Sequence, residues 1–417
     1  MGGSGVQRPV KFAKYLKRFG WEPIVVAPEP GIYHTFDESL SKELNDAGIR
    51  IERVQNSALL KAGKKSINPS HSKPWKAALL KWITSWFFLP DNKKGWIDDA
   101  VKKCVELTES ESISALFATA PPYSNLIAAQ RVKAKTGLPV IMDLRDDWLE
   151  SHLINYPTRW HYNKMKRLES DTLKIPDHIT VVNSYYKSKI KDRLGKDSPD
   201  ITVIPNGFDR ETFAANDSSG KNRKFVILYS GLFYGSRKPD WFLKSVKKVM
   251  EEHDDFSKHV QLWFQGGLNQ SHRKTINDLG LREFVTDFGY LEHHNAVGNV
   301  MKADVLFLTL GERRHIDAVT PGKVFEYMGS KKPILAYIPE GVTRSLLDKY
   351  GAASCVSITD VDGGADAILK FYEMWKTNSL PSGSDEFIQS FDRLNLTEQL
   401  SAILDRITEE IKPEADK

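Results

Sequence analysis

The chain has 417 residues, which is too long for one ordinary core and enough for two or three domains of about 100–200 residues each. Hydrophobic residues make up 41% and charged residues 27%, a balance that excludes a wholly disordered or fibrous chain. The net charge of +5 is mild for a nucleic-acid binder and suits anionic substrates or an acidic membrane surface without requiring either. Neither a signal peptide nor a membrane-spanning apolar run is visible, so we expect a cytoplasmic protein.

A glycine loop, Gly2-Gly3-Ser4-Gly5, opens the chain and leads directly into a helical pattern that ends at Gly20. In a doubly wound domain such a loop follows a central strand, so we expect that a first strand is missing here. The helix N-terminus behind Gly3, Ser4 and Gly5 is suited to bind phosphate or to let a substrate approach the backbone. A plain turn is an equal alternative.

From residue 23 onward, short β-branched runs alternate with helical patterns, which predicts parallel sheets covered by helices on both faces. The strands expected in the first half are 24–27, 49–54, 115–119, 140–143, 178–182 and 201–204. They predict an N-terminal α/β domain over residues 1–210.

Aromatic and basic side chains mix in the segment from Trp75 to Phe88, which has a helical pattern. Such a helix is suited to lie on a membrane surface, which would make the protein peripheral at the inner face of the membrane. The alternative is a hydrophobic arm that packs on the domain.

Charged residues gather where the strand at 140–143 ends, at Asp143, Arg145 and Asp146. Ligands of open α/β sheets bind at the carboxyl ends of strands, so these residues are candidates for the acceptor side. The alternative is a salt-bridge network from Arg145 to the Asp residues that braces the interdomain cleft. The turn at Asn206 and Gly207 follows the strand at 201–204 and is a candidate for donor binding because of its place before the linker.

The polar segment 211–223 has little to bury and is typical of an interdomain linker. After it the alternation restarts, with strands expected at 225–229, 260–264, 285–288, 304–309, 333–337 and 353–358. They predict a second doubly wound domain over residues 224–380. Leucine and isoleucine then form one helical stripe within residues 381–417, and we expect that helix to dock back toward the first domain.

The segment that begins at Thr320 carries the strongest site signal. Thr320 suits a helix N-cap, and Pro321 suits the first helical position, followed by Gly322. Lys323 is unfavourable to the dipole of the helix it opens, so its charge is best explained by an anion shared with the helix end, and a diphosphate fits. Glu326, one turn further, can accept hydrogen bonds from vicinal sugar hydroxyls. The alternative is a surface helix with solvated Lys and Glu.

A second pair of cations follows the strand at 225–229. There a glycine turn at Gly231 precedes Arg237 and Lys238, so these residues and Lys323 are placed to face one diphosphate from two sides. A solvated pair of side chains is the alternative.

Five segments of the chain together match one family: GGSGVQRPVKFAKYLKRFGWEPIVVAP, LPVIMDLRDDW, VIPNGFD, ADVLFL and PGKVFEYMGSKKPIL. The sequence resembles the family 4 retaining glycosyltransferases, especially those that build bacterial surface polysaccharides, and the resemblance covers nearly the whole chain. It implies the α/β GT-B fold, in which two doubly wound, Rossmann-like domains face a cleft.

The resemblance also assigns roles. Glu326 matches the second Glu of the family's paired-glutamate motif, which holds the donor ribose, and Arg237 or Lys238 together with Lys323 match the cations that bind the diphosphate. The first Glu of the motif is replaced by Ala318, and Thr119 to Tyr123 lack the histidine that many relatives carry there. No protein base is therefore named.

By this resemblance the chain moves a sugar from a nucleotide-diphosphate donor to a saccharide or lipid-linked acceptor, with retention and without a metal or other cofactor. Arg237, Lys323 and Glu326 are the expected catalytic residues, and no nucleic acid is expected as a partner. Two alternatives stay open: a nucleotide-sugar epimerase of the same fold, and an inactive sugar-nucleotide-binding partner of a polysaccharide assembly complex.

Overall fold

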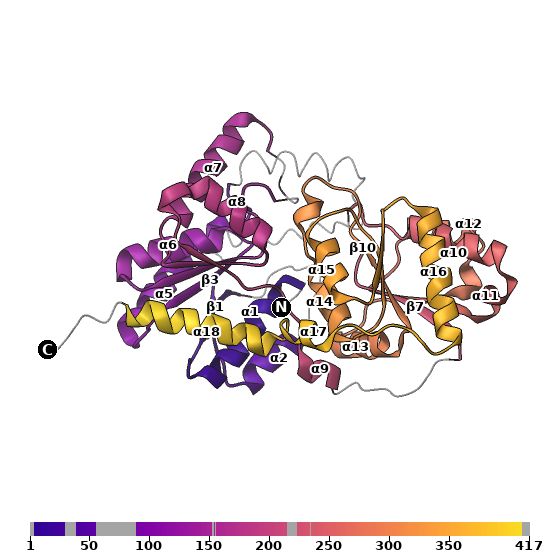
Figure 1. Cartoon of the computed structure of the whole chain (residues 1–417). Coiled ribbons are helices and arrows are strands. Elements are labelled where there is room, and N and C mark those ends of the chain that lie inside the picture. Colours follow the sequence, from indigo (N-terminus) through magenta and orange to yellow (C-terminus); the bar gives the residue numbers. More distant parts are fainter. Residues whose placement is uncertain are drawn as a thin grey trace. The chain divides into compact units, whose positions relative to one another are not determined.

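The computed structural model describes residues 4–29, 39–55, 89–151, 154, 156–214, 223–233 and 235–410. The chain divides into two compact units (Figure 1). Unit 1 comprises Met1–Pro205 and Leu396–Lys417, and unit 2 comprises Asn206–Asn395. The prediction for the segment from Trp75 to Phe88 lies outside the described residues.

Unit 1 contains two parallel sheets. The smaller one pairs β1 with β2, and the larger one has the order β3-β4-β5-β6. The strands are β1 (Ile24–Pro28), β2 (Arg50–Val54), β3 (Leu116–Ala120), β4 (Val140–Leu144), β5 (His178–Val181) and β6 (Asp200–Val203). Each lies within two residues of its predicted bounds, because buried parallel strands show as short, nearly continuous apolar runs.

Helices surround these sheets and bury apolar stripes against them. They are α1 (Gln7–Leu16), α2 (Ser39–Asp46), α5 (Ile97–Ser110), α6 (Ser124–Thr136), α7 (Arg159–Leu173), α8 (Ser184–Leu194) and α18 (Arg393–Glu409). Helix α1 uses two sides: Val10 and Ala13 pack with residues of α2, whereas Phe12 and Leu16 pack with residues of α18.

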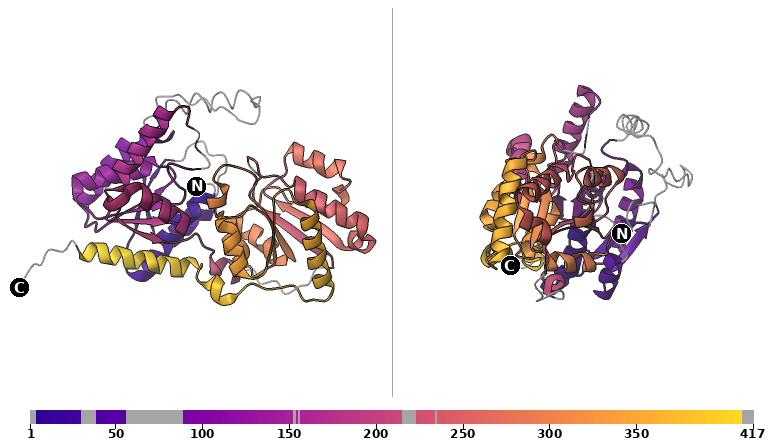
Figure 2. Two further views of the ribbon diagram at one scale, coloured as in Figure 1. Left: turned by 45° about the horizontal axis from the view of Figure 1, so that its top comes forward. Right: turned by 90° about the vertical axis from the view of Figure 1, so that its right-hand side faces the viewer.

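Helix α18 lies along the other elements of unit 1, as both views of Figure 2 and Figure 1 show in yellow. Its apolar stripe is buried against Phe12, Ile141 and Ile204 and consists of Leu396, Leu400, Ile403, Leu404 and Ile407. The chain joins unit 1 from Leu396 onward, so residues 381–395, which include the first three residues of α18, group with unit 2.

The boundary between the units falls at Pro205 and Asn206, before the predicted linker. Phe208 explains the difference, because its backbone N–H donates to Phe391 and its carbonyl accepts from the N–H of Arg393. The Phe208 ring is buried in the core of unit 2. Residues 211–214 of the predicted linker are part of a short helix, α9 (Arg210–Ala214), and residues 215–222 lie outside the described part of the chain.

Unit 2 is built on one six-stranded parallel sheet with the order β12-β11-β10-β7-β8-β9. Its strands are β7 (Phe225–Ser230), β8 (Val260–Gln265), β9 (Val285–Asp287), β10 (Val305–Thr309), β11 (Ile334–Tyr337) and β12 (Ala353–Val356). Its longer helices are α10 (Asp240–Glu252), α12 (Gln270–Asp278), α13 (His293–Lys302), α14 (Gly322–Gly329), α15 (Val342–Tyr350) and α16 (Val361–Lys376). The shorter α11 (Asp254–His259) follows α10, and α17 (Asp385–Gln389) follows α16.

Two apolar cores cover the two faces of this sheet. Along β7, Phe225, Ile227 and Tyr229 join residues of α10, α12 and α16, whereas Val226 and Leu228 join residues of α13, α14 and α15. This alternation follows from the two-residue period of a strand. Figure 1 shows α10 and α16 on one side of the sheet and α14 and α15 on the other. Both sequence-predicted α/β domains are thus confirmed.

The strand order of unit 2 places a ligand site. Strand β7 is the first of this unit and lies between β10 and β8, so the chain moves outward to β9 and then returns to the other side of β7. In open parallel sheets such a reversal leaves a crevice at the carboxyl ends of the two central strands. Here these strands are β7, followed by Gly231, and β10, which precedes α14.

Candidate functional site

Glycines let three loops meet at the carboxyl edge of the unit 2 sheet. Gly231 follows β7 with a φ of 120°, and its N–H donates to Gln265 at the end of β8. A Cβ on Gly266 would lie 2.5 Å from the Gly231 carbonyl, and one on Gly311, after β10, would lie 2.6 Å from the Ser236 carbonyl. Only glycine permits such close backbone contacts.

Lys323, in the first turn of α14, reaches back over the end of β7. Its Nζ donates a hydrogen bond of 2.9 Å to the Tyr229 hydroxyl and lies 4.1 Å from the centre of that ring. A Cβ on Gly231 would lie 2.8 Å from this Nζ. Within the described part of the chain, Lys323 forms no salt bridge. Desolvation, followed by the charge of Arg237, lowers the pKa of Lys323 to about 7.

The two predicted cations after β7 differ in their surroundings. Arg237 is buried, with 6% of its surface exposed, and it lies close enough to Lys323 to repel its charge. Lys238 is exposed. The structure therefore brings Arg237 close to Lys323, whereas the roles of both Arg237 and Lys238 in diphosphate binding stay predictions.

Glu326 lies one turn along α14 and shares a hydrogen bond with His293, which begins α13. The distance from His293 Nε2 to Glu326 Oε1 is 3.1 Å. Burial by itself raises the pKa of Glu326, but the hydrogen bond from His293 and the charges of His293, Arg393 and Lys323 outweigh it, so the pKa lies below its ordinary value. Glu326 is thus an ionised acceptor. His293 was not predicted, because a contact across 33 residues leaves no local signal.

The start of α14 differs from its prediction. Pro321 is the N-cap and Gly322 the first helical residue, with no side-chain cap, so Thr320 is not the N-cap. The reason is that Pro321 has extended backbone angles, which already turn the chain into the helix, while the Thr320 hydroxyl is buried without a hydrogen-bond partner. The first N–H groups of α14 therefore have no side-chain acceptor of their own, which suits them to bind an anion.

In unit 1 the predicted acceptor candidate Asp143 is fully buried at the end of β4. Its two carboxylate oxygens accept hydrogen bonds from Arg8 (2.8 and 3.1 Å), Thr119 (2.7 Å) and Thr180 (2.7 Å). Burial raises the pKa of Asp143, but the Arg8 charge and these hydrogen bonds bring it below its ordinary value. These donors use the acceptor positions of Asp143, so the carboxylate braces unit 1 through Arg8 and not through Arg145, as the salt-bridge alternative expected. A role of Asp143 in ligand binding stays a prediction.

Arg145 is engaged in a similar way. Its guanidinium donates to the carbonyl oxygens of Ala120, Gly5 and Pro121, and desolvation lowers its pKa. These bonds hold Gly5 against the end of β3. Asp146 is half-buried beside Arg145. Burial, and after it the charge of Asp146, raises the pKa of Tyr123. Gly3 and the side chain of Ser4 lie outside the described residues, so their roles stay predictions, as do those of Asn206 and Gly207.

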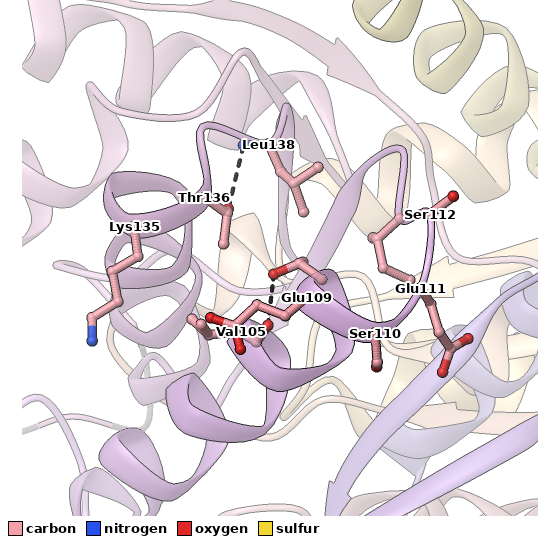
Figure 3. Close-up of a pocket in the computed structure, with 10 residues that line it drawn as sticks. Val105, Glu109, Ser110, Glu111, Ser112, Lys135, Thr136 and Leu138 are labelled. Atoms are coloured by element: carbon pink, nitrogen blue, oxygen red, sulfur yellow. Dashed lines mark hydrogen bonds between the residues drawn. The ribbon is translucent and has the colours of Figure 1, made fainter.

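A pocket of unit 1 lies between the C-terminal ends of α5 and α6, as Figure 3 shows. Its polar lining includes Glu109, Glu111 and Lys135. These residues precede β3 and β4, so the pocket opens at the amino ends of the strands, whereas ligands of such sheets bind at the carboxyl ends. This pocket is not the site that the strand-end residues form.

Two searches of the described residues gave negative results. No group of three or more His, Cys, Asp or Glu side chains is arranged to hold a metal ion. None of the described helices combines the length and the apolar character needed to cross a bilayer.

Known proteins resemble this chain in sequence over about its first half and in fold over nearly its whole length. The model of the family described as Glycosyltransferase Family 4 matches residues 5–212. No curated protein matches the chain. A glycosyltransferase from Rickettsia africae superposes with a TM-score of 0.66 at 14% identity, covering 98% of this chain and 96% of that one.

Two further solved structures are similar over nearly their full length. HepE from Anabaena, in complex with UDP and glucose, has a TM-score of 0.62 at 15% identity and covers 97% and 96% of the two chains. Sucrose-phosphate synthase from Thermosynechococcus elongatus has a TM-score of 0.64 at 12% identity, with 98% and 94% covered. Identities this low establish the fold, so the chain has the GT-B fold of these glycosyltransferases, and its residues 5–212 are similar to the family described as Glycosyltransferase Family 4.

Proposed function

We propose that this protein transfers a sugar, with retention, from a nucleoside-diphosphate donor to a saccharide or lipid-linked acceptor. The observation that carries the proposal is the cluster of Lys323, Arg237 and Glu326 at the carboxyl ends of β7 and β10, where the strand order reverses. At such a crevice, two cations suit the diphosphate of a nucleoside diphosphate, and an ionised carboxylate suits its ribose.

In this proposal each group has a distinct partner. Lys323, Arg237 and the N-terminus of α14 bind the diphosphate, and the absence of a glycine side chain at Gly231 and Gly322 lets the phosphates approach the backbone. Glu326 accepts hydrogen bonds from the ribose hydroxyls. A solved structure of similar fold, HepE, contains UDP and glucose, which supports testing UDP first.

Catalysis is then mainly electrostatic. The leaving diphosphate gathers negative charge as its bond to the sugar breaks, so Lys323 and Arg237 stabilise the transition state more than the ground state. Retention follows from the family resemblance, and a departing phosphate oxygen takes the acceptor's proton. This route needs neither a protein base nor a metal ion.

The proposed acceptor and the proposed cellular location rest on the same family resemblance. We propose a role in cell-surface polysaccharide synthesis, in the cytoplasm, with the segment from Trp75 to Phe88 as the contact to the membrane. The Gly3 to Gly5 loop, Arg145 and Asp146 stay the candidates for the acceptor side.

One observation favours the alternative of an inactive donor-binding partner. Ala318 replaces the first Glu of the motif and is buried in a single 3₁₀ turn, so no carboxylate at that position can bind the donor sugar.

Turnover of radiolabelled UDP-sugars, with and without a mixture of saccharide and lipid-linked acceptors, tests the proposal. We expect release of UDP that depends on acceptor. Turnover without acceptor would indicate an epimerase, and binding without turnover would indicate the inactive partner.

A further inference from the structure

His293 stands out among the groups near the site because nothing in the proposed reaction has used it. It is the first residue of α13, whereas Glu326 belongs to α14, and the two side chains are linked at 3.1 Å. The acceptor is a carboxylate, so His293 Nε2 is the donor. Both side chains are partly exposed, 27% for His293 and 24% for Glu326, so the pair lies at the surface of the crevice and not in a core.

The two oxygens of Glu326 have different surroundings. Oε1 is held by His293, whereas Oε2 has no hydrogen bond to any residue in the described part of the chain and is not among the buried atoms without a partner. Oε2 is therefore open to a ligand. The hydrogen bond to His293 also fixes the direction in which Oε2 points, because a Glu side chain otherwise rotates about its three side-chain torsions.

A competing partner for Glu326 is close by. Lys323 lies one turn before it on α14 and attracts its charge, and Lys323 itself has no salt bridge within the described residues. Residues three apart on a helix are neighbours, so a Glu326 released from His293 can pair with Lys323. That pairing would use up both the ribose acceptor and a diphosphate cation.

We propose that His293 is a positioning residue for donor binding: it holds Glu326 away from Lys323 and directs its free oxygen to the ribose. The proposal rests on the function proposed above. It assigns His293 no contact with the reacting atoms.

Calorimetric titration with UDP, GDP and ADP, and with inorganic pyrophosphate, tests this role. We expect His293→Ala to weaken binding of the preferred nucleoside diphosphate on the order of tenfold, which is the range for loss of a hydrogen bond to a charged group. Pyrophosphate binding should also weaken, but less, because Lys323 becomes paired. In turnover assays the donor KM should rise more than kcat falls.

Three further variants separate positioning from a general structural effect. His293→Gln keeps an N–H donor at a similar distance from the backbone and should restore most of the affinity. His294→Ala, at the exposed neighbouring histidine, should leave affinity unchanged. In a Glu326→Ala background, His293→Ala should add almost nothing, because its only effect acts through Glu326.

The outcomes distinguish this proposal from the function on which it rests. If wild-type protein binds one of the three nucleotides and folded His293→Ala binds it equally well, the positioning role is overturned and the donor site stands. Equal losses in His294→Ala and His293→Ala would overturn it as well. If wild-type protein binds none of the three nucleotides, both proposals fall.

Discussion

Charged side chains gather at the carboxyl ends of parallel strands in both units, with opposite results. In unit 1, Asp143 receives four hydrogen bonds from Arg8, Thr119 and Thr180 and is fully buried. In unit 2, Lys323 makes one hydrogen bond, to the Tyr229 hydroxyl, and forms no salt bridge within the described residues, although the charge of Glu326 acts on it. The first cluster is complete without a ligand, whereas the second is not.

The comparison shows how a cluster of charges that stabilises the fold can be distinguished from one that binds a ligand. A strand-end position and a charge are common to both clusters, so neither property decides. What decides is whether the protein itself satisfies the charge. A desolvated cation with a lowered pKa gains from an incoming anion, whereas a carboxylate with four donors has no acceptor position left to offer.

The largest effect is expected where the brace is broken. Asp143→Ala leaves the Arg8 guanidinium buried without its carboxylate and should lower the free energy of unfolding by about 3–5 kcal/mol. Urea denaturation measures this change, with Asp146→Ala at the half-buried neighbour as the matched control. A loss below about 1 kcal/mol in Asp143→Ala would show that the cluster is not a brace.

In unit 2 the main effect should fall on turnover. Lys323→Met removes a cation that meets charge growing in the transition state, so kcat should fall about 10²-fold or more while stability hardly changes. Lys331→Met, at the exposed far end of α14, is the control. Near-normal turnover in Lys323→Met would mean that the diphosphate binds elsewhere.

Glu326→Ala should weaken binding of the nucleoside diphosphate by about 1.5–3 kcal/mol, because an ionised acceptor of the ribose hydroxyls is lost. Calorimetry gives the dissociation constant, and the exposed Glu340→Ala in the same unit serves as the control. An unchanged constant in the folded variant would make Glu326 a solvated surface residue.

The smallest expected effect is on pH dependence. In the free site the pKa of Lys323 is about 7, and a bound diphosphate should raise it, so binding takes up a proton. The part of the diphosphate affinity that comes from charged Lys323 is fully present below the pKa of the free site and is lost as the pH rises above that value. This predicts roughly tenfold weaker binding at about pH 9 than at about pH 7.5. Lys323→Arg stays charged and should remove this dependence. A wild-type affinity that is constant over this range would contradict the assignment.

Much of the fold could be predicted from the sequence because parallel strands are short apolar runs between helical patterns. The strand of β7 was predicted to within one residue, since both of its faces are buried. The start of α14 was less predictable: Thr320 and Pro321 both suit a helix start, and only the backbone angles show which of them caps it.

The roles of the site residues were harder to predict, because they depend on contacts far apart in the chain. Asp143 and Arg8 are separated by 135 residues, so no local pattern shows that the charge of Asp143 is already satisfied. Lys323 and Glu326 were identified because helix dipole and spacing act locally. His293 and its pairing with Glu326 were missed because that contact joins two different helices.

The position of α18 has a consequence for the order in which the protein folds on the ribosome. Unit 2 is one continuous stretch and can close its core once Asn395 has emerged. Unit 1 is synthesised first, yet Phe12 and Ile141 stay without Leu400 and Leu404 until the residues that follow unit 2 have emerged. The first half of the chain therefore waits for the whole of unit 2, and during that time its apolar surface is open to chaperones and to premature association.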